Sequence, residues 1–399
     1  MQSRSVLYII CWLATASAGI SATLFSVYLP SITRTLLGSD APAFKSHMGS
    51  WGGAAFLLGW ALGAFALGVY ADRNGRKKTL IVSILLCSLA TFTIAFVGDF
   101  SVVVALRFVS GIGAGAILLI NAVIVSEAFA TSRNRTVVVG ILINAFPVGL
   151  IVAGVLHGFI QNYQTSYMLS GLSALLAVAV ALVVPESEVW KSGTARVRKA
   201  NLFAREYRRD LGIGVTLFGS MLVGLWAAFM WMPTWVSSLS LPEHQQTNRA
   251  LANIMLGGGS VAGGLISGLV SNAWGRRKAA ALGYASVFAV SAGIFIFMHV
   301  PGVLFFAMVF LLSTCIGFNQ GVLTGYLPEL FPTAVRASAV GLSFNVGRVV
   351  TAVTVFFVGV IATMFGRLEY AMFTFSFAYL VGLVALGYAR ETRGRELPQ

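Results

Sequence analysis

Residues 68–78 read Gly-Val-Tyr-Ala-Asp-Arg-Asn-Gly-Arg-Lys-Lys, and residues 268–278 read Gly-Leu-Val-Ser-Asn-Ala-Trp-Gly-Arg-Arg-Lys. Both stretches fit the pattern G-x-x-x-[D/N]-x-x-G-R-[K/R]-K, and each lies between two long apolar runs. A second pair of turns repeats at a similar offset, with Ser-Glu-Ala-Phe-Ala-Thr at 126–131 and Pro-Glu-Leu-Phe-Pro-Thr at 328–333. The pattern indicates a duplicated unit, and transporters are often built from two such repeats around one binding site.

Apolar residues dominate the composition. Of the 399 residues, 57% are hydrophobic and only 10% are charged, far less charge than a soluble protein carries. Apolar stretches of about 20 residues, the length that a helix needs to cross ~30 Å of hydrocarbon, recur along the chain. The sequence therefore predicts an all-α polytopic membrane protein with twelve transmembrane helices. These helices are expected near 6–30, 48–71, 79–97, 100–126, 137–159, 166–184, 212–238, 250–271, 279–298, 302–327, 338–363 and 368–389.

The first apolar run has a second interpretation. Arg4, the apolar stretch after it and the small residues near Ala18 also match a secretory signal peptide. We interpret the run as a helix, because it continues to Ile32 and because removing it would leave an odd number of spans.

Two six-helix bundles are then predicted at 1–188 and 212–399. The basic, amphipathic linker at 189–211 is expected to lie along the anionic inner leaflet.

Basic residues indicate the orientation in the membrane. Of the 27 Lys and Arg residues, 21 fall at one face of the predicted helices and four at the other. The positive-inside rule makes the first face cytoplasmic and places both termini there, in a multi-pass protein of the cytoplasmic (inner) membrane. The net charge of +14 is then a consequence of topology. It does not indicate binding to nucleic acid, for which the chain has no recognition motif.

The other two arginines, Arg107 and Arg348, lie within apolar helices. Arg348 is 12 residues beyond Arg336 at the cytoplasmic turn, which places it roughly 18 Å deep. An arginine there costs about 2.5–3.5 kcal/mol on the mildest scale, and the sequence offers no carboxylate at that depth. We predict that Arg348 faces a cavity and binds an anion, with bonding to helix carbonyls or snorkelling to water as the alternative. For Arg107, nearer the periplasmic end, a structural role is favoured over a ligand-binding one.

The turn at 68–78 resembles the loop between the second and third helices of the major facilitator superfamily. The turn at 268–278 is a degenerate second copy, with Asn272 at the position of Asp72. The resemblance covers the whole chain and implies two pseudo-symmetric six-helix bundles. It also implies a cytoplasmic latch, in which arginines pair with acids when the inside is shut. The implied gate residues are Asp72, Arg76, Glu127, Arg135, Arg276, Glu329 and Arg336.

Within that latch, Glu127 is expected to pair with Arg76 or Arg135. Glu329 is expected to pair with Arg276 or Arg336.

Three other motifs resemble the sugar-porter and organic-ion branch of the superfamily. They are Arg-Phe-Val-Ser-Gly-Ile-Gly-Ala-Gly at 107–115, Pro-Glu-Ser at 185–187 and Tyr-Leu-Pro-Glu-Leu-Phe-Pro-Thr at 326–333. Asn-Val-Gly-Arg-Val at 345–349 resembles the eleventh-helix motif of organic anion, aromatic acid and sialate carriers. In organic anion transporters that arginine is implicated in holding the substrate's carboxylate, so the resemblance implies this role for Arg348.

The first helix departs from the pattern of proton-coupled acid carriers. Those carriers often begin with D-G-[YF]-D, whereas Ala18 and Ser21 stand at the two acidic positions here. A coupling carboxylate needs a wet cavity in which its pKa can approach neutrality. We therefore expect transport that depends less on a pH gradient than in relatives with both acids. Facilitated diffusion, anion exchange and a proton carried by the substrate itself all stay open.

Few other polar residues lie at membrane depth. Amides within lipid usually face the bundle interior, where they either tie helices together or contact a ligand. Aromatic residues could form a wall suited to a ring substrate, with lipid contact as the alternative. The candidate lining residues, with Arg348 and Arg107, are Asn121, Asn144, Asn319, Gln320, Asn345, Tyr28, Trp226 and Trp231.

We interpret the chain as a secondary active or facilitative transporter of a small organic anion, working as a monomer in the lipid bilayer by alternating access, with protons as a second partner left open. The alternatives are a neutral sugar or polyol facilitator, a metabolite exporter of the same fold, and a non-transporting membrane sensor. An enzyme is disfavoured, since the sequence shows no nucleophile motif, metal cluster or cofactor loop. No cofactor or metal is expected.

Overall fold

The computed structural model describes residues 2–38, 42–129, 135–186, 203–332 and 335–393, and at 2–3, 42–46, 135–137 and 337 it describes the backbone alone. Within this part, twelve helical spans are long and apolar enough to cross a membrane. The prediction of an all-α, twelve-span membrane protein is confirmed. The chain divides into two compact units, Met1–Arg196 and Val197–Gln399. The predicted linker falls largely on residues 187–202, outside the described residues, so its course along the membrane stays a prediction.

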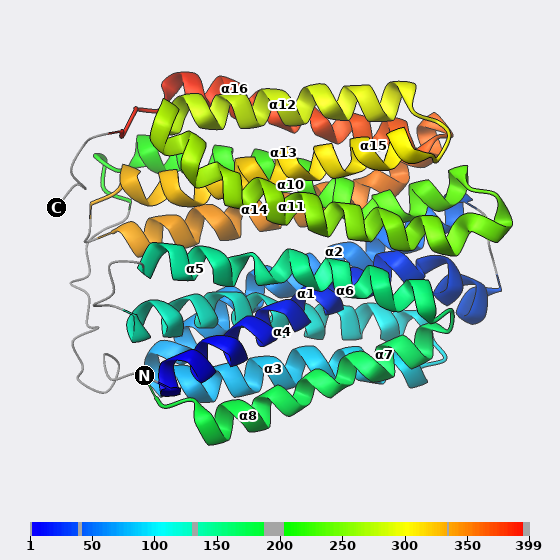
Figure 1. The fold of residues 1–399 in the computed structure, drawn as a ribbon, viewed down its shortest axis with the longest axis horizontal. Helices are drawn as coiled ribbons and strands as arrows, with labels where there is room; N and C mark the ends of the chain where they lie inside the picture. The colour runs from blue at the N-terminus through cyan, green and yellow to red at the C-terminus, as the bar shows by residue number, and fades with distance from the viewer. Residues whose placement is uncertain (1, 39–41, 130–134, 187–202, 333–334, 394–399) are drawn as a thin grey trace. The chain divides into compact units, whose positions relative to one another are not determined.

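The first unit contains six spans that lie along a common direction, which is horizontal in Figure 1. The fifth span is divided between α5 and α6, and the sixth between α7 and α8. The elements are α1 (Gln2–Leu37), α2 (Pro42–Asn74), α3 (Arg76–Thr93), η1 (Ile94–Phe96), α4 (Phe100–Ala128), α5 (Arg135–Ile143), α6 (Ala145–Phe159), α7 (Tyr163–Gly171), η2 (Leu172–Ala174) and α8 (Leu175–Val183).

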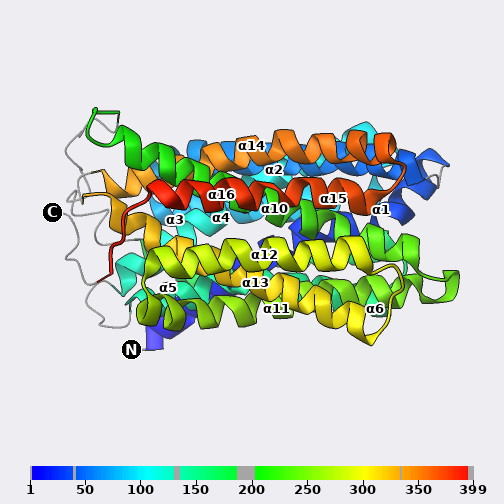
Figure 2. The ribbon, with the colours of Figure 1, turned by 90° about the horizontal axis from the view of Figure 1, so that it is seen from above.

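The second unit repeats this plan with six further spans (Figure 2). The last of these, the twelfth span of the chain, is divided between α15 and α16. The elements are α10 (Arg208–Leu239), η3 (Pro242–His244), α11 (Gln245–Trp274), α12 (Arg276–Phe297), α13 (Val303–Tyr326), η4 (Leu327–Leu330), α14 (Arg336–Phe365), α15 (Leu368–Ser376) and α16 (Ala378–Tyr388).

Prolines in the first and fifth spans have different effects on the helix. Helix α1 continues through Pro30 to Leu37, beyond the predicted end at residue 30, since a membrane helix tolerates a single proline. The fifth span breaks at Asn144, between α5 and α6. Pro147 follows three residues later and has no N–H to donate to the carbonyl of Ile143, which weakens the helix at this point.

Glycines bring the second and fourth helices of each unit into backbone contact. In the first unit, a Cβ on Gly63 of α2 would lie 2.0 Å from the carbonyl oxygen of Ile112 on α4. In the second unit, a Cβ on Gly263 of α11 would lie 1.9 Å from the carbonyl oxygen of Thr314 on α13. Lipid supplies no hydrophobic force between helices, so such close packing of small residues is what holds them together. The duplication predicted from the two basic turns therefore extends into the packing of the bundles.

We predict that Gly263→Ala destabilises the second unit by roughly 1–3 kcal/mol, the usual effect of overpacking a tight contact. The added methyl group would displace the backbone of α13. Gly268→Ala on the same helix is the matched control, because a Cβ there would meet nothing within 4 Å. Thermal unfolding in detergent measures the difference, and equal melting temperatures for the two variants would contradict the proposed packing.

Candidate functional site

The first polar network lies where α2, α3 and α4 meet, at the turn at 68–78 in the first unit. Arg76 Nη1 lies 2.5 Å from Asp72 Oδ1, and Arg76 Nη2 lies 3.8 Å from Glu127 Oε1. Arg76 is largely buried, whereas Asp72 is exposed. Of the two partners that the sequence leaves open for Glu127, Arg76 is thus in ion-pair range. The side chain of Arg135 lies outside the described residues.

Glu186 contacts the same turn. It was not among the gate residues predicted from the sequence. Its Oε1 accepts hydrogen bonds from the backbone N–H groups of Arg76 (2.8 Å) and Lys77 (3.2 Å). These are the first residues of α3, whose free N–H groups favour a negative charge. Gly75 precedes them at φ +107°, and a Cβ there would lie 2.3 Å from Glu186 Oε2. The glycine therefore provides both the turn and the space for the capping carboxylate.

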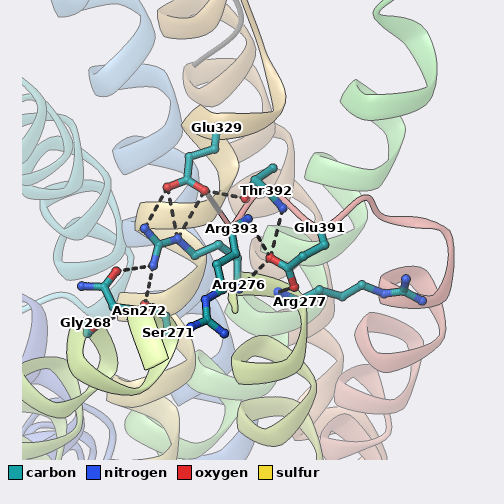
Figure 3. A network of polar contacts seen from close by, with 9 residues as sticks. All are labelled: Gly268, Ser271, Asn272, Arg276, Arg277, Glu329, Glu391, Thr392 and Arg393. Atoms are coloured by element: carbon teal, nitrogen blue, oxygen red, sulfur yellow. Dashed lines mark hydrogen bonds and ion pairs between the residues drawn. The ribbon is translucent and has the colours of Figure 1, made fainter. Parts of the chain in front are cut away.

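The second unit has the corresponding network, with a different distribution of charge (Figure 3). Arg276 approaches Glu329 through two nitrogens, with Nε and Nη2 each 3.1 Å from Oε1. Arg276 Nη1 donates to Asn272 Oδ1 at 2.5 Å. Because Asn272 is neutral where the first unit has Asp72, the charge of Arg276 is directed to Glu329. Arg336, the other partner considered for Glu329, donates from Nε to the carbonyl oxygens of Pro328 and Phe331.

Glu391 caps α12 as Glu186 caps α3. It accepts hydrogen bonds from the backbone N–H groups of Arg276 (2.9 Å) and Arg277 (3.1 Å), the first residues of that helix. Thr392 Oγ1 donates to Glu329 Oε2 at 2.5 Å, so the chain beyond the last helix also contacts the ion pair (Figure 3). The signal for both caps is present in the sequence, since an acid follows the end of the sixth and of the twelfth span by three residues.

The pKa of Glu391 lies below its ordinary value. Partial burial acts to raise this pKa, but the hydrogen bonds from the N–H groups of Arg393, Arg276, Arg277 and Thr392 lower it further than burial raises it. A carboxyl with a depressed folded-state pKa adds stability above its unfolded pKa, and that stability is lost as pH falls through the folded value.

We predict that Glu391→Gln lowers the melting temperature at pH 7 by about 2–4 °C, the shift expected from about 1 kcal/mol in a unit of this size. The difference from the unsubstituted protein should shrink as the pH falls from about 4.5, the ordinary value for a glutamate, through the lower pKa of Glu391 in the folded protein. Glu243→Gln, at an exposed position on η3, is the control. Thermal unfolding between pH 3 and pH 8 makes the comparison, and a difference that stays constant over that range would exclude the capping role.

Arg107 is enclosed inside the first unit. It is only 1% exposed, and its Nη1 and Nη2 donate to the carbonyl oxygens of Ser21 (2.8 Å) and Ala22 (3.3 Å) on α1. The guanidinium carbon also lies 4.1 Å from the centre of the Phe56 ring. These contacts correspond to the structural alternative, in which carbonyls and an aromatic face stabilise the charge. One of these carbonyls belongs to Ser21, which stands at one of the two positions where the acidic pattern described above is missing.

Arg348 occupies a different setting, on α14 in the second unit. Its guanidinium carbon lies 5.0 Å from the centre of the Phe344 ring, which in turn packs 4.0 Å from Phe218 of α10. The two helices approach closely beside it, because a Cβ on Gly347 would lie 3.0 Å from the backbone nitrogen of Gly219. The glycine of the Asn-Val-Gly-Arg motif thus brings α14 against α10, and the arginine follows immediately on a half-buried face.

The amide side chains that were predicted to line a cavity lie in different surroundings. Asn121 is fully buried and donates from Nδ2 to the Cys11 carbonyl (2.9 Å) and to Thr15 Oγ1 (3.0 Å), which ties α4 to α1. Asn144 lies at the break of the fifth span and donates to the carbonyl of Gly140. Asn319 is fully buried against Gly283 of α12, where a Cβ would lie 2.7 Å from its Oδ1. Gln320 and Asn345 are half-buried, and Asn345 lies one turn before Arg348.

The predicted aromatic residues are buried. Tyr28 bonds through its hydroxyl to the carbonyl of Ile160 and to Ser166 Oγ, both at 2.6 Å, and its ring meets His157 edge-on. Trp226 and Trp231 are 7% and 0% exposed on α10. Tyr28, Arg107, Asn121 and Asn144 therefore belong to the first unit, and the remaining candidates belong to the second. Asn345 and Arg348 are the pair that one helix face brings together.

Comparison with known proteins gives the class of this protein. A family model of the Major Facilitator Superfamily matches residues 11–355, and the chain belongs to that superfamily. The structure is similar to the inward-open xylose transporter XylE of E. coli, with a TM-score of 0.79, 16% identity, and coverage of 99% of this chain and 98% of that one. That likeness shows the fold.

Relatives in sequence include carriers of organic acids. The chain is 26% identical to a probable 4-methylmuconolactone transporter of Cupriavidus pinatubonensis over 96% of this chain and 90% of that protein. It is 24% identical to the 4-hydroxybenzoate transporter of Pseudomonas aeruginosa, over 87% of this chain and 83% of that protein. The resemblance to the organic-anion and aromatic-acid branch is confirmed.

Proposed function

We propose that the protein carries a small organic acid, as its anion, across the cytoplasmic membrane by alternating access. The observation that carries this proposal is Arg348, an arginine within a membrane-spanning helix, seated on an aromatic ring in an Asn-Val-Gly-Arg motif. The names of the relatives, which include transporters of 4-methylmuconolactone and 4-hydroxybenzoate, support a substrate that is an unsaturated or aromatic acid.

Arg348 would bind the carboxylate of the substrate. A guanidinium is planar and always charged, and it matches a carboxylate with two parallel hydrogen bonds. The guanidinium carbon lies 5.0 Å from the centre of the Phe344 ring, a contact that stabilises a cation at this position. The carbonyl and hydroxyl bonds of Arg107, Asn121 and Tyr28 favour roles in building the first unit, whereas Asn345 shares the helix face of Arg348.

The cytoplasmic networks would act as gate elements. The Arg76–Glu127 and Arg276–Glu329 pairs tie helices within one unit each, and breaking or forming such pairs shifts the balance between two conformations. The basic turns at 73–78 and 276–278 support a cytoplasmic location for these networks and for both termini. We propose that the carrier works as a monomer.

We predict that Arg348→Ala abolishes binding of carboxylic acids, and that Arg348→Lys weakens it by roughly 10- to 100-fold, because the paired hydrogen bonds are lost. Arg367→Lys is the matched control, since Arg367 also lies 5.0 Å from an aromatic ring, that of Tyr370, at an exposed position. Binding of radiolabelled aromatic acids and of their uncharged amides to purified protein makes the test. Normal binding by Arg348→Ala, or equal binding of acid and amide, would refute the assignment.

Residues of the first unit support the expectation that transport is only weakly coupled to protons. A symporter of one proton gains about tenfold in accumulation per pH unit, the ratio that 1.36 kcal/mol represents. Here Ala18 and Ser21 replace the two acids, and Arg107 is bonded to the backbone carbonyls of Ser21 and Ala22. We predict that accumulation in proteoliposomes changes far less than tenfold when an inward proton gradient of one unit is imposed. Protein-free liposomes correct for passive entry of the neutral acid, and steep gradient-driven accumulation would contradict the prediction.

A further inference from the structure

Helix α14 presents a hydrogen-bond acceptor one turn before Arg348. Asn345 Oδ1 is buried, and none of the described residues donates a hydrogen bond to it. Buried acceptors in folded proteins nearly always have a donor, because leaving one unpaired in an apolar interior is costly. The amide oxygens of Asn121, Asn253 and Asn319 also lack a donor among the described residues, but Asn345 alone of these four lies one helical turn from Arg348. Its position beside the proposed ligand-binding group therefore points to a donor that the ligand supplies.

The position of Asn345 places this acceptor beside the guanidinium. Residues three apart on a helix are neighbours, with Cβ atoms about 5–6 Å apart. Gly347, between them in sequence, lies against Gly219 of α10, so the backbone at this point is held by a helix crossing. Phe344 supports the guanidinium and is itself packed on Phe218. The acceptor and the cation are thus presented from one fixed stretch of helix.

We propose that Asn345 and Arg348 together select aromatic acids that carry a hydroxyl group. The substrate's carboxylate binds Arg348, and its hydroxyl donates a hydrogen bond to Asn345 Oδ1. One helical turn separates the two protein groups, a spacing comparable with the span of a benzene ring that bears the two substituents. This inference rests on the proposed function, because it assumes that Arg348 binds the carboxylate.

The chemistry of the amide sets the selectivity. An amide oxygen accepts hydrogen bonds and donates none, so it pairs with a hydroxyl or an amine but not with an ether oxygen or a halogen. A site built around such an acceptor discriminates strongly against an analogue that lacks the donor, because the acceptor is then left unpaired. A methoxy group, similar in size to a hydroxyl but without a donor, is therefore the sharpest probe.

The test uses the full-length protein in proteoliposomes and four probes: benzoate, 3-hydroxybenzoate, 4-hydroxybenzoate and 4-methoxybenzoate. We expect the better of the two hydroxybenzoates to bind at least about tenfold more tightly than the methoxy compound. In Asn345→Leu this ratio should fall to about one through loss of hydroxybenzoate affinity, while benzoate affinity changes by less than about twofold. Thr354→Val on the same helix should keep the ratio, because the Thr354 hydroxyl bonds only to carbonyls of its own helix.

Several outcomes would overturn the inference. A ratio near one in the unsubstituted protein would do so without any variant, which protects the test if Asn345→Leu does not fold. A large ratio that persists in Asn345→Leu would also do so, and would show that another group reads the hydroxyl. If Arg348→Ala loses all four probes while the ratio is independent of Asn345, only this inference fails. If Arg348→Ala binds benzoate normally, the proposed function fails, and the inference fails with it.

Discussion

A positive charge placed among apolar helices must be compensated by the protein or by something that the protein binds. The two arginines within membrane-spanning helices lie in different surroundings. Arg107 is enclosed in the first unit, with two carbonyl oxygens of α1 and the face of Phe56 around it. Arg348 rests on Phe344 at a half-buried position beside a helix crossing. The same residue type thus holds one bundle together and, in our proposal, recognises cargo in the other.

The duplication preserved geometry more strictly than charge. Both units have a left-handed glycine before the third helix of the bundle, a carboxylate on the first N–H groups of that helix, and a glycine-mediated crossing of the second and fourth helices. The charge differs, because Asn272 is neutral where the first unit has Asp72. Arg76 is shared between two acids, whereas Arg276 makes a close, two-nitrogen contact with one. Two networks with the same backbone geometry can therefore differ in the strength of their ion pairs.

The sequence predicted the parts of this structure that follow from local patterns. Hydropathy locates the spans, and the turn at 68–78 identifies the family, because both signals are contained in short stretches. The contacts of individual polar residues were not predictable in this way. Asn121 bonds a helix 110 residues away in sequence, and Asn319 packs against Gly283, since an apolar span does not reveal which neighbour each face meets. The caps by Glu186 and Glu391 were overlooked because each acid stands beyond a span and acts on a distant helix.

The stretch after the last helix is part of the folded protein. Glu391 and Thr392 connect the start of α12 with Glu329 at the end of the tenth span, although both lie beyond Tyr388, where α16 ends. Trimming the chain just after its final membrane crossing would therefore uncap a helix and remove a ligand of an ion pair. Affinity tags and fluorescent fusions are best attached beyond Arg393, so that the reporter does not disturb the helix cap or the ion pair.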